Sequence, residues 1–147
     1  SWNLNNLIDS SLSLVQYDKR AKDVKIVKDL SADLPEVNTD GNQLSQVFVN
    51  LILNAVDAMP EGGVLTVRSS KDNGKIVIDF EDTGIGIQKD NLNKIFDPFF
   101  TTKEKGTGLG LAVSYSIVRK LNGILTVDSE QNKGSRFRIA LPVDGGK

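Results

Sequence analysis

The 147-residue sequence contains no histidine and no cysteine. The absence of cysteine excludes disulfide bonds and thiol chemistry, and it suits a reducing compartment. The absence of histidine removes the commonest general base and metal ligand from any reaction that this chain could carry out alone. No apolar run approaches the roughly 20 residues that a membrane helix needs, and no signal peptide is visible. We therefore expect no direct insertion of this chain into a membrane.

The chain also lacks an excess of either charge, since 18 basic and 19 acidic residues give a formal net charge of −1. This balance provides no general attraction to nucleic acid or to an anionic membrane. Hydrophobic residues make up 39% and charged residues 25% of the chain, which is ordinary for a globular protein. The length suits one domain, so residues 1–147 are expected to fold as a single unit without a nucleic-acid partner.

Apolar residues recur at helical spacing in some segments and alternate with polar residues in others. The predicted helices cover residues 4–21, 40–59 and 109–121, and the predicted strands cover 24–30, 63–70, 75–82, 124–130 and 135–142. Asp40 is expected to cap the second helix, Asn122-Gly123 to end the third, and Asn73-Gly74 to form a tight hairpin turn. The predicted fold class is α+β, a two-layer α/β sandwich in which a mixed, mostly antiparallel sheet packs on three helices.

Residues 83–108 form a long irregular segment that is rich in Gly, Thr and Lys, with a short helical stretch at 89–96. Connections of this length are usually functional or disordered, so we expect it to contribute to a functional site. Its end, within "KGTGLGL", places glycines at alternate positions before the third helix. Such glycines let backbone N–H groups approach an anion at a helix N-terminus, although a simple flexible loop would look the same.

The second helix carries an unusual polar face. Helical geometry gathers its apolar residues on one side and its polar residues on the other. The apolar set is Leu44, Val47, Phe48, Leu51, Ile52 and Ala55, and the polar set is Gln43, Gln46, Asn50, Asn54 and Asp57. A solvated face normally carries Lys and Glu, whereas this face carries amides and a single acid. Asn50 and Asn54 are one turn apart, so their oxygens can converge on a hard cation such as Mg²⁺.

The segment "DFEDTGIGI" ends a predicted strand at Asp82 and continues into a tight turn that contains Gly84 and Gly86. An aspartate at a strand end can simply form a turn. In a pocket opened by glycines, its carboxylate can instead accept a hydrogen bond from an exocyclic amino group, which adenine offers. The apolar side chains expected to flank that ring are Ile85, Ile87 and Val77.

Taken in order, the segments "NLILNA", "DTGIG", "FDPFFTTK" and "GTGLGL" resemble the N, G1, F and G2 boxes of the ATP-binding catalytic domain of two-component sensor histidine kinases. The flanking elements fit the same domain, so the resemblance covers essentially the whole chain. The segments "NAVDAMPEGG" and "PFFTTKEKGTGLGL" are most similar to the nitrogen-regulation branch. The resemblance implies the Bergerat fold of DNA gyrase B, MutL and the heat-shock chaperone ATPases, with a mobile lid over the nucleotide.

The resemblance also implies roles for individual residues. Asp82 would bind the adenine amino group, Asn54 would coordinate a Mg²⁺ that bridges the phosphates, and Asn50 would support the phosphate end as a catalytic residue. Other residues implied at the ATP or ADP site are Asp57, Gly84, Gly86, Ile87, Thr107, Gly108, Leu109, Gly110, Leu111 and Ser135, the last through a bound water. Gly106 would join Gly108 and Gly110 as a lid hinge, and Phe96 and Phe99 would anchor the lid.

Two positions depart from the family pattern. Many members carry a basic residue where this chain has Asp57, and many carry Arg or Lys where it has Thr101. The charge of the γ-phosphate must then be neutralised from elsewhere. Lys103 is our first candidate, as a catalytic and nucleotide-contacting residue, and Lys105 is the second.

The implied function is that of a protein histidine kinase domain, which binds Mg-ATP and donates the γ-phosphate to a histidine. With no histidine of its own, the chain is not expected to phosphorylate itself. The implied partners are ATP, a histidine-containing dimerisation domain of the same kinase and a response regulator. The implied location is the cytoplasm, either free or as part of a membrane-anchored kinase.

Three other interpretations stay open. A superfamily ATPase would carry Glu in place of Asn50 to activate water, because an amide cannot act as a general base. A serine-kinase anti-sigma factor would normally be a complete small protein without the long leading helix. A degenerate interaction module would be favoured if Asn54, Asp82 or the lid glycines were missing, and all are present.

Overall fold

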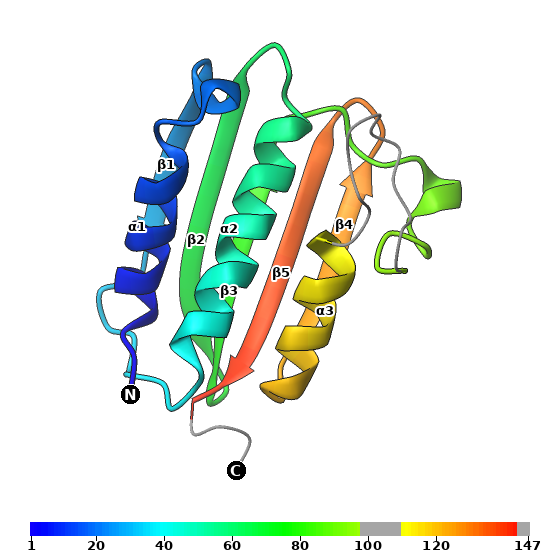
Figure 1. Ribbon diagram of the computed structural model, residues 1–147. Coiled ribbons are helices and arrows are strands. Elements are labelled where there is room, and N and C mark those ends of the chain that lie inside the picture. Colours follow the sequence, from blue (N-terminus) through cyan, green and yellow to red (C-terminus); the bar gives the residue numbers. More distant parts are fainter. Residues whose placement is uncertain (98–109, 144–147) are drawn as a thin grey trace.

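The computed structural model describes residues 1–97 and 110–143, which form a five-stranded sheet with three helices against one of its faces (Figure 1). The helices are α1 (Leu4–Val15), α2 (Gly41–Asp57) and α3 (Gly110–Lys120), and the short 3-10 helices are η1 (Lys19–Ala21) and η2 (Lys89–Asn91). The strands are β1 (Val24–Leu30), β2 (Gly63–Asp72), β3 (Lys75–Asp82), β4 (Ile124–Glu130) and β5 (Gly134–Pro142). This arrangement confirms the predicted α+β sandwich.

The strand order in the sheet is β1-β2-β3-β5-β4. β1 and β2 are parallel, with α2 as the crossover between them, and every other pair is antiparallel. Because β5 returns between β3 and β4, residues of two separate hairpins meet at one end of the sheet. Asp82, the last residue of β3, lies opposite Ser135 of β5 in this register. The topology therefore places Asp82 next to residues that are far from it in the sequence.

The ends of the helices follow local capping. The Asp40 carboxylate accepts a hydrogen bond from the Gln43 N–H at 3.2 Å, so α2 begins where the sequence predicts. α1 ends at Val15, well before the predicted residue 21. There the Asp18 carboxylate accepts the Arg20 N–H at 2.9 Å, which starts the separate turn η1 instead of continuing α1.

Turns between elements use left-handed residues as the sequence predicts. Asn73 (φ 50°) and Gly74 (φ 81°) form the β2–β3 turn, which matches the twist of a tight hairpin. Asn122 (φ 64°) ends α3, and the Gly123 N–H donates to the Val118 carbonyl at 2.9 Å. The left-handed residue at the end of α3 is thus the asparagine of the predicted pair.

The core lies between the sheet and the helices. The apolar face of α2 is buried as predicted, and the Phe48 ring centroid lies 5.7 Å from that of Phe80 on β3. Burial of a large apolar side chain contributes about 1.5–3 kcal/mol, so this face holds α2 firmly on the sheet. The amide-bearing face of α2 is left to face α3 and the loops around it.

The segment before α1 is fixed to the start of α2. The backbone N–H and carbonyl of Trp2 both pair with Val37, each at 2.8 Å. A Cβ atom on Gly41 would lie 2.2 Å from the indole ring of Trp2. Only glycine therefore lets the first residue of α2 touch the indole so closely.

The face of the sheet opposite the helices carries paired charges. Asp79 of β3 accepts two hydrogen bonds from the Arg138 guanidinium of β5, at 2.7 and 3.0 Å. Glu81 accepts a hydrogen bond from Arg68 at 3.3 Å. Because side chains alternate along a strand, Val77 lies on this same face, whereas Asp82 lies on the helix side with Phe80. The expectation that Val77 flanks a ring bound at Asp82 was therefore wrong.

Candidate functional site

The amide face of α2 makes direct contact with the first turns of α3. The Asn50 Nδ2 group donates to the Ser114 hydroxyl at 3.3 Å and, more weakly, to the Gly110 carbonyl at 3.5 Å. Ser114 is completely buried. Since the Asn50 amide nitrogen is the atom that bonds to α3, the amide oxygen is the atom of this side chain that could accept a hydrogen bond or bind a cation. Asn54 is one helical turn further along α2, as the sequence predicts.

Among the described residues, no group of three or more His, Cys, Asp or Glu side chains could hold a metal ion. A magnesium ion at this face of α2 would therefore rely on amide oxygens, phosphate oxygens and water. Mg²⁺ accepts such ligand sets, because it usually keeps several waters and binds substrate phosphates. The amides of Asn50 and Asn54 fit that chemistry.

Asp82 is the buried carboxylate of the site and is 3% exposed. Its Oδ1 atom accepts the Gly84 N–H at 2.9 Å, which closes a tight turn after β3. Its Oδ2 atom is buried and has no hydrogen-bond partner within residues 1–97 and 110–143. An unpaired buried acceptor is costly, so its presence points to a ligand that brings a donor.

The environment of Asp82 disfavours its charge. Burial raises the pKa of the carboxyl above its ordinary value of 3.8; the N–H groups of Gly84 and Ser135 oppose that shift, and the neighbouring charge of Glu81 adds to it. A carboxylate that is poorly solvated in the free protein gains more from a ligand donor than an exposed one does. A buried carboxyl with a raised pKa beside a hollow is a candidate binding residue.

The loop after Asp82 is held between two other elements by close backbone contacts. A Cβ atom on Gly84 would lie 2.3 Å from the Ala58 carbonyl oxygen at the end of α2. A Cβ atom on Gly86, which has φ +71°, would lie 2.1 Å from the Glu130 carbonyl oxygen at the end of β4. The Ile85 N–H also donates to the Ala58 carbonyl at 2.9 Å. These glycines thus allow one loop to join α2 to the β4–β5 hairpin.

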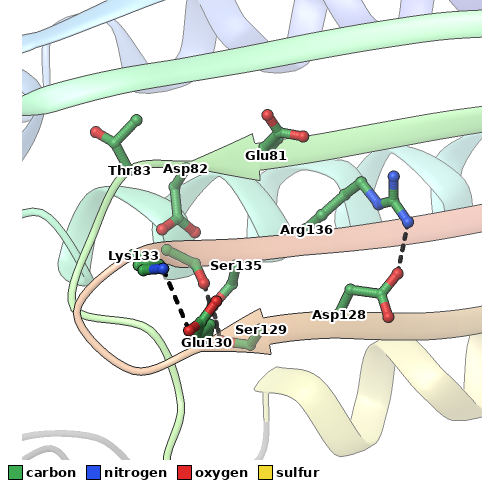
Figure 2. A pocket seen from close by; sticks show the side chains of 10 residues that line it. Glu81, Asp82, Thr83, Asp128, Ser129, Glu130, Lys133, Ser135 and Arg136 are labelled. Carbon is green, nitrogen blue, oxygen red and sulfur yellow. Dashed lines mark hydrogen bonds and ion pairs between the residues drawn. The ribbon is translucent and has the colours of Figure 1, made fainter.

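A hollow of about 530 Å³ lies at the ends of β3, β4 and β5 (Figure 2). Asp82, Ser129 and Ser135 line it, together with charged residues such as Arg136 of the opposite sheet face. The Ser129 and Ser135 hydroxyl oxygens are 2.7 Å apart, and Ser129 also accepts the Ile87 N–H at 2.8 Å. The hollow therefore contains the Asp82 end of the site, while the α2 amides are not among its lining residues.

Asp57 lies at the end of α2 and is held by a residue from η1. Its carboxylate accepts a hydrogen bond from the Arg20 guanidinium at 3.0 Å, and Arg20 also pairs with Asp18 at 2.8 Å. Hydrogen bonds from Arg20 lower the pKa of Asp18 to about 2. Arg20 thus places a cation beside the position where the sequence departs from the family pattern.

The predicted phosphate-binding segment falls partly outside the described residues. Lys103, Thr107, Gly108 and Leu109 all lie there, as do Thr101, Lys105, Gly106 and Phe99. Gly110 begins α3, and a Cβ atom there would meet nothing within 4 Å among the described residues. Leu111 packs against the core.

An aromatic cluster joins the segment after η2 to α3 and β5. The Phe96 ring stacks on Tyr115 with centroids 5.0 Å apart, and its edge faces Phe137 of β5 at 6.5 Å. Phe96 is partly buried against the core. It therefore attaches the segment that follows η2 to the body of the domain, and its expected role as an anchor of the lid stays a prediction. Ile85, in contrast, is 56% exposed.

The structure adds three residues that the sequence does not single out, namely Ser114, Ser129 and Arg20. Each acts on a predicted site residue that is distant in the chain: the separation is 64 positions for Asn50 and Ser114, 42 for Ile87 and Ser129, and 37 for Arg20 and Asp57. The one available signal was Ser114 itself, a small polar residue on the buried side of an amphipathic helix.

Comparison with known proteins places the chain among ATP-binding kinase domains. Residues 39–145 match the family model described as histidine kinase-, DNA gyrase B-, and HSP90-like ATPase. Sensor histidine kinase ZraS of Escherichia coli (strain K12) is 43% identical over 141 residues, which are 96% of this chain and 30% of that protein. Sporulation kinase E of Bacillus subtilis (strain 168) is 40% identical over 138 residues, which are 93% of this chain and 19% of that protein. The chain thus spans less than a third of these curated relatives.

Solved structures give the same result. The nucleotide-free catalytic domain of histidine kinase ThkA superposes with a TM-score of 0.88 at 30% identity, covering 98% of this chain and 95% of that one. Full-length ShkA in complex with AMPPNP has a TM-score of 0.86 at 27% identity, with 96% and 30% covered. ThkA in complex with the response regulator TrrA has a TM-score of 0.85 at 26% identity, with 99% and 42% covered.

Proposed function

This chain belongs to the family of histidine kinase-, DNA gyrase B-, and HSP90-like ATPases, and from that premise we propose that it binds Mg-ATP and donates the γ-phosphate to a histidine on a separate domain. It is the ATP-binding catalytic domain of the histidine kinase type. The acceptor must lie on another domain or chain, because this chain contains no histidine. In the full kinase we assign that role to a dimerisation domain.

The observation that carries the proposal is the buried, unpaired Oδ2 atom of Asp82. A carboxylate oxygen can only accept hydrogen bonds, and the exocyclic amino group of adenine supplies a donor. The Gly84–Gly86 loop keeps Asp82 in place through the end of α2 and the β4–β5 hairpin. The adenine ring would then lie on the helix side of the sheet, next to Ser135 and Ile87.

The phosphate end of the proposed site lies at the facing sides of α2 and α3. The Asn50 and Asn54 amides supply oxygens from α2, and the N-terminus of α3 contributes the positive end of a helix dipole. A magnesium ion bound there would neutralise phosphate charge. We propose Asn54 as its ligand, and Lys103, with Thr107, Gly108 and Leu109, as further phosphate contacts.

The chemistry assigned to this chain is positioning and charge stabilisation. Asn50 cannot remove a proton from water, because an amide is not a general base, and its nitrogen is already engaged with Ser114. This argues against the superfamily ATPase and for transfer to an acceptor histidine. The presence of Asn54, Asp82 and Gly110 argues against a degenerate interaction module.

We further propose a response regulator as the partner of the full kinase, by analogy with the ThkA structure that contains TrrA. Within residues 1–97 and 110–143, no helix is long and apolar enough to cross a membrane. We propose a cytoplasmic position for this domain, where ATP is available.

Calorimetric titration with ADP, with and without Mg²⁺, tests the binding proposal. We expect Mg²⁺ to strengthen binding in the wild type, Asp82→Ala to abolish binding, and the exposed hairpin variant Asp72→Ala to bind like the wild type. Absence of binding by the folded wild type would refute nucleotide binding. Incubation with labelled ATP and a histidine-containing dimerisation domain tests transfer of the phosphoryl group. A covalent, acid-labile phosphoryl label on this chain itself would contradict the assignment of the acceptor.

A further inference from the structure

Ser129 of β4 joins three parts of the Asp82 end of the site (Figure 2). Its hydroxyl oxygen accepts the Ile87 N–H at 2.8 Å, is 3.0 Å from the Gly134 carbonyl oxygen and is 2.7 Å from the Ser135 hydroxyl. Ile87 belongs to the loop that follows Asp82, and Ser135 lies opposite Asp82 in the sheet. One side chain thus connects the loop, the β4–β5 hairpin and the neighbour of Asp82.

The hydrogen-bonding capacity of a hydroxyl fixes the direction of these bonds. A serine hydroxyl has one proton to donate and two lone pairs to accept with. The Ile87 N–H uses one lone pair, and the Gly134 carbonyl, which can only accept, takes the proton. The remaining lone pair of Ser129 then accepts the proton of Ser135. Ser135 is left with only lone pairs to present to a ligand.

From this geometry we propose that Ser129 is a positioning residue: it keeps the Ser135 hydroxyl an acceptor beside the Asp82 carboxylate, and so favours 6-amino purines over 6-oxo purines. The proposal rests on the proposed nucleotide-binding function and names its base specificity. An adenine amino group offers donors to this pair, directly or through a water. A 6-oxo purine brings an acceptor at position 6, and its N1–H is the one donor on that edge, so the 6-oxo oxygen faces acceptors and stays unpaired.

The dissociation constants of ADP and IDP, measured by calorimetry, test the proposal, because IDP carries a 6-oxo group in place of the 6-amino group. We expect Ser129→Ala to lower the preference for ADP over IDP about three- to tenfold, the worth of one hydrogen bond. Loss of Ser129 frees the Ser135 proton, which can then be donated to the 6-oxo group. Ser129→Thr keeps the hydroxyl and is expected to keep the wild-type preference.

Ser69→Ala is the matched control. The Ser69 hydroxyl, on β2, also accepts a backbone N–H, from Ser31 at 3.0 Å, and donates to the Asn5 side chain at 2.8 Å. Its partners are remote from Asp82. We expect Ser69→Ala to lower the melting temperature and to leave the ratio of the ADP and IDP dissociation constants unchanged.

Equal weakening of ADP and IDP binding in Ser129→Ala would overturn the proposal, because it would give Ser129 a purely structural role. If Ser129→Ala does not fold, Ser129→Cys keeps the size of the side chain and weakens its hydrogen bonds. An unchanged ADP preference in the folded Cys variant overturns the proposal too. Failure of the wild type to bind ADP refutes the proposed function instead, so the two failures are distinguishable.

Discussion

Replacement of Asp82 by asparagine should stabilise the free domain and weaken its binding of ADP. The free protein buries a carboxylate with one unpaired oxygen, and burial raises its pKa. A neutral amide of the same shape keeps an acceptor for the Gly84 N–H and costs less to bury. We expect a gain of about 1 kcal/mol in the free energy of unfolding, which raises the melting temperature by roughly 2–4 °C.

The same change removes a charge-assisted hydrogen bond to the ligand. Hydrogen bonds to charged groups are worth about 1.5–3 kcal/mol, so ADP binding should weaken roughly 10- to 150-fold. Stability and binding thus change in opposite directions. Calorimetry measures the dissociation constant, and thermal unfolding in the absence of nucleotide measures the stability.

The pH dependence of stability is a second, independent test of whether Asp82→Asn stabilises the free domain. Since the folded pKa of Asp82 lies above its ordinary value of 3.8, the unfolded chain loses this proton first as pH rises. Its contribution to stability therefore falls as pH rises through the interval between the unfolded and folded pKa values. The advantage of Asp82→Asn should be largest at neutral pH and should vanish below pH 3.8, where both states hold the proton.

Asp79→Asn is the matched control, because Asp79 is also buried, at 7% exposure, but is paired with Arg138. Removing that charge should lower stability and leave ADP binding unchanged, since Asp79 lies on the other face of the sheet. The reasoning is refuted if Asp82→Asn destabilises the free domain as Asp79→Asn does. It is equally refuted if Asp82→Asn binds ADP as tightly as the wild type.

Three further predictions concern the loop, the helix contact and the charge cluster. Gly86→Ala places a Cβ atom 2.1 Å from a backbone oxygen at φ +71°, so thermal or denaturant unfolding should show a loss of roughly 3 kcal/mol in the free energy of unfolding. The control Gly74→Ala, at φ +81° with nothing within 4 Å, should lose about 1 kcal/mol. Ser114→Ala removes the partner of the α2 amide and should weaken Mg-ADP binding about two- to tenfold in calorimetry, with little effect on ADP alone. If Asp57 acts at the nucleotide site only as a negative charge that Arg20 neutralises, Arg20→Ala should weaken ADP binding, most at low salt, because Asp57 then repels the phosphates. The additional change Asp57→Ala removes that charge and should restore binding.

Ser11→Ala removes another fully buried helix hydroxyl, bonded to the Leu7 carbonyl at 2.8 Å, and should leave the effect of Mg²⁺ intact. An equal loss of Mg²⁺ dependence in both serine variants contradicts the role of Ser114. Equal destabilisation by Gly86→Ala and Gly74→Ala contradicts the close approach at Gly86. Failure of the double variant to recover ADP binding contradicts the pairing of Arg20 with Asp57 as the cause.

Sequence patterns predicted the fold because helices, caps and turns depend on interactions between residues that are close in the sequence. The apolar face of α2, its Asp40 cap and the Asn73-Gly74 turn depend on residues within a few positions, and all three are confirmed. The end of α1 was wrong because a side-chain cap at Asp18 competes with helix continuation, and apolar spacing does not report that competition.

The candidate site was predictable only in part. Asn50, Asn54 and Asp82 could be identified because amides on one helix face and an acid before a glycine turn are unusual. Their partners could not, since the contact between Asn50 and Ser114 arises from the packing of α2 against α3. The error at Val77 was avoidable, because residues five apart on a strand point to opposite faces.

The close contact between the Trp2 indole and Gly41 determines what the tryptophan fluorescence of this domain can report. Trp2 is the only tryptophan in the sequence. It contacts the first residue of α2, and Asn54 lies 13 residues further along that helix, which corresponds to about 20 Å. Its emission will therefore follow the docking of the N-terminal segment onto α2. A change in Trp2 emission on addition of ADP would mean that α2 moves as a rigid body, so that nucleotide binding near Asn54 displaces the other end of the helix against the indole.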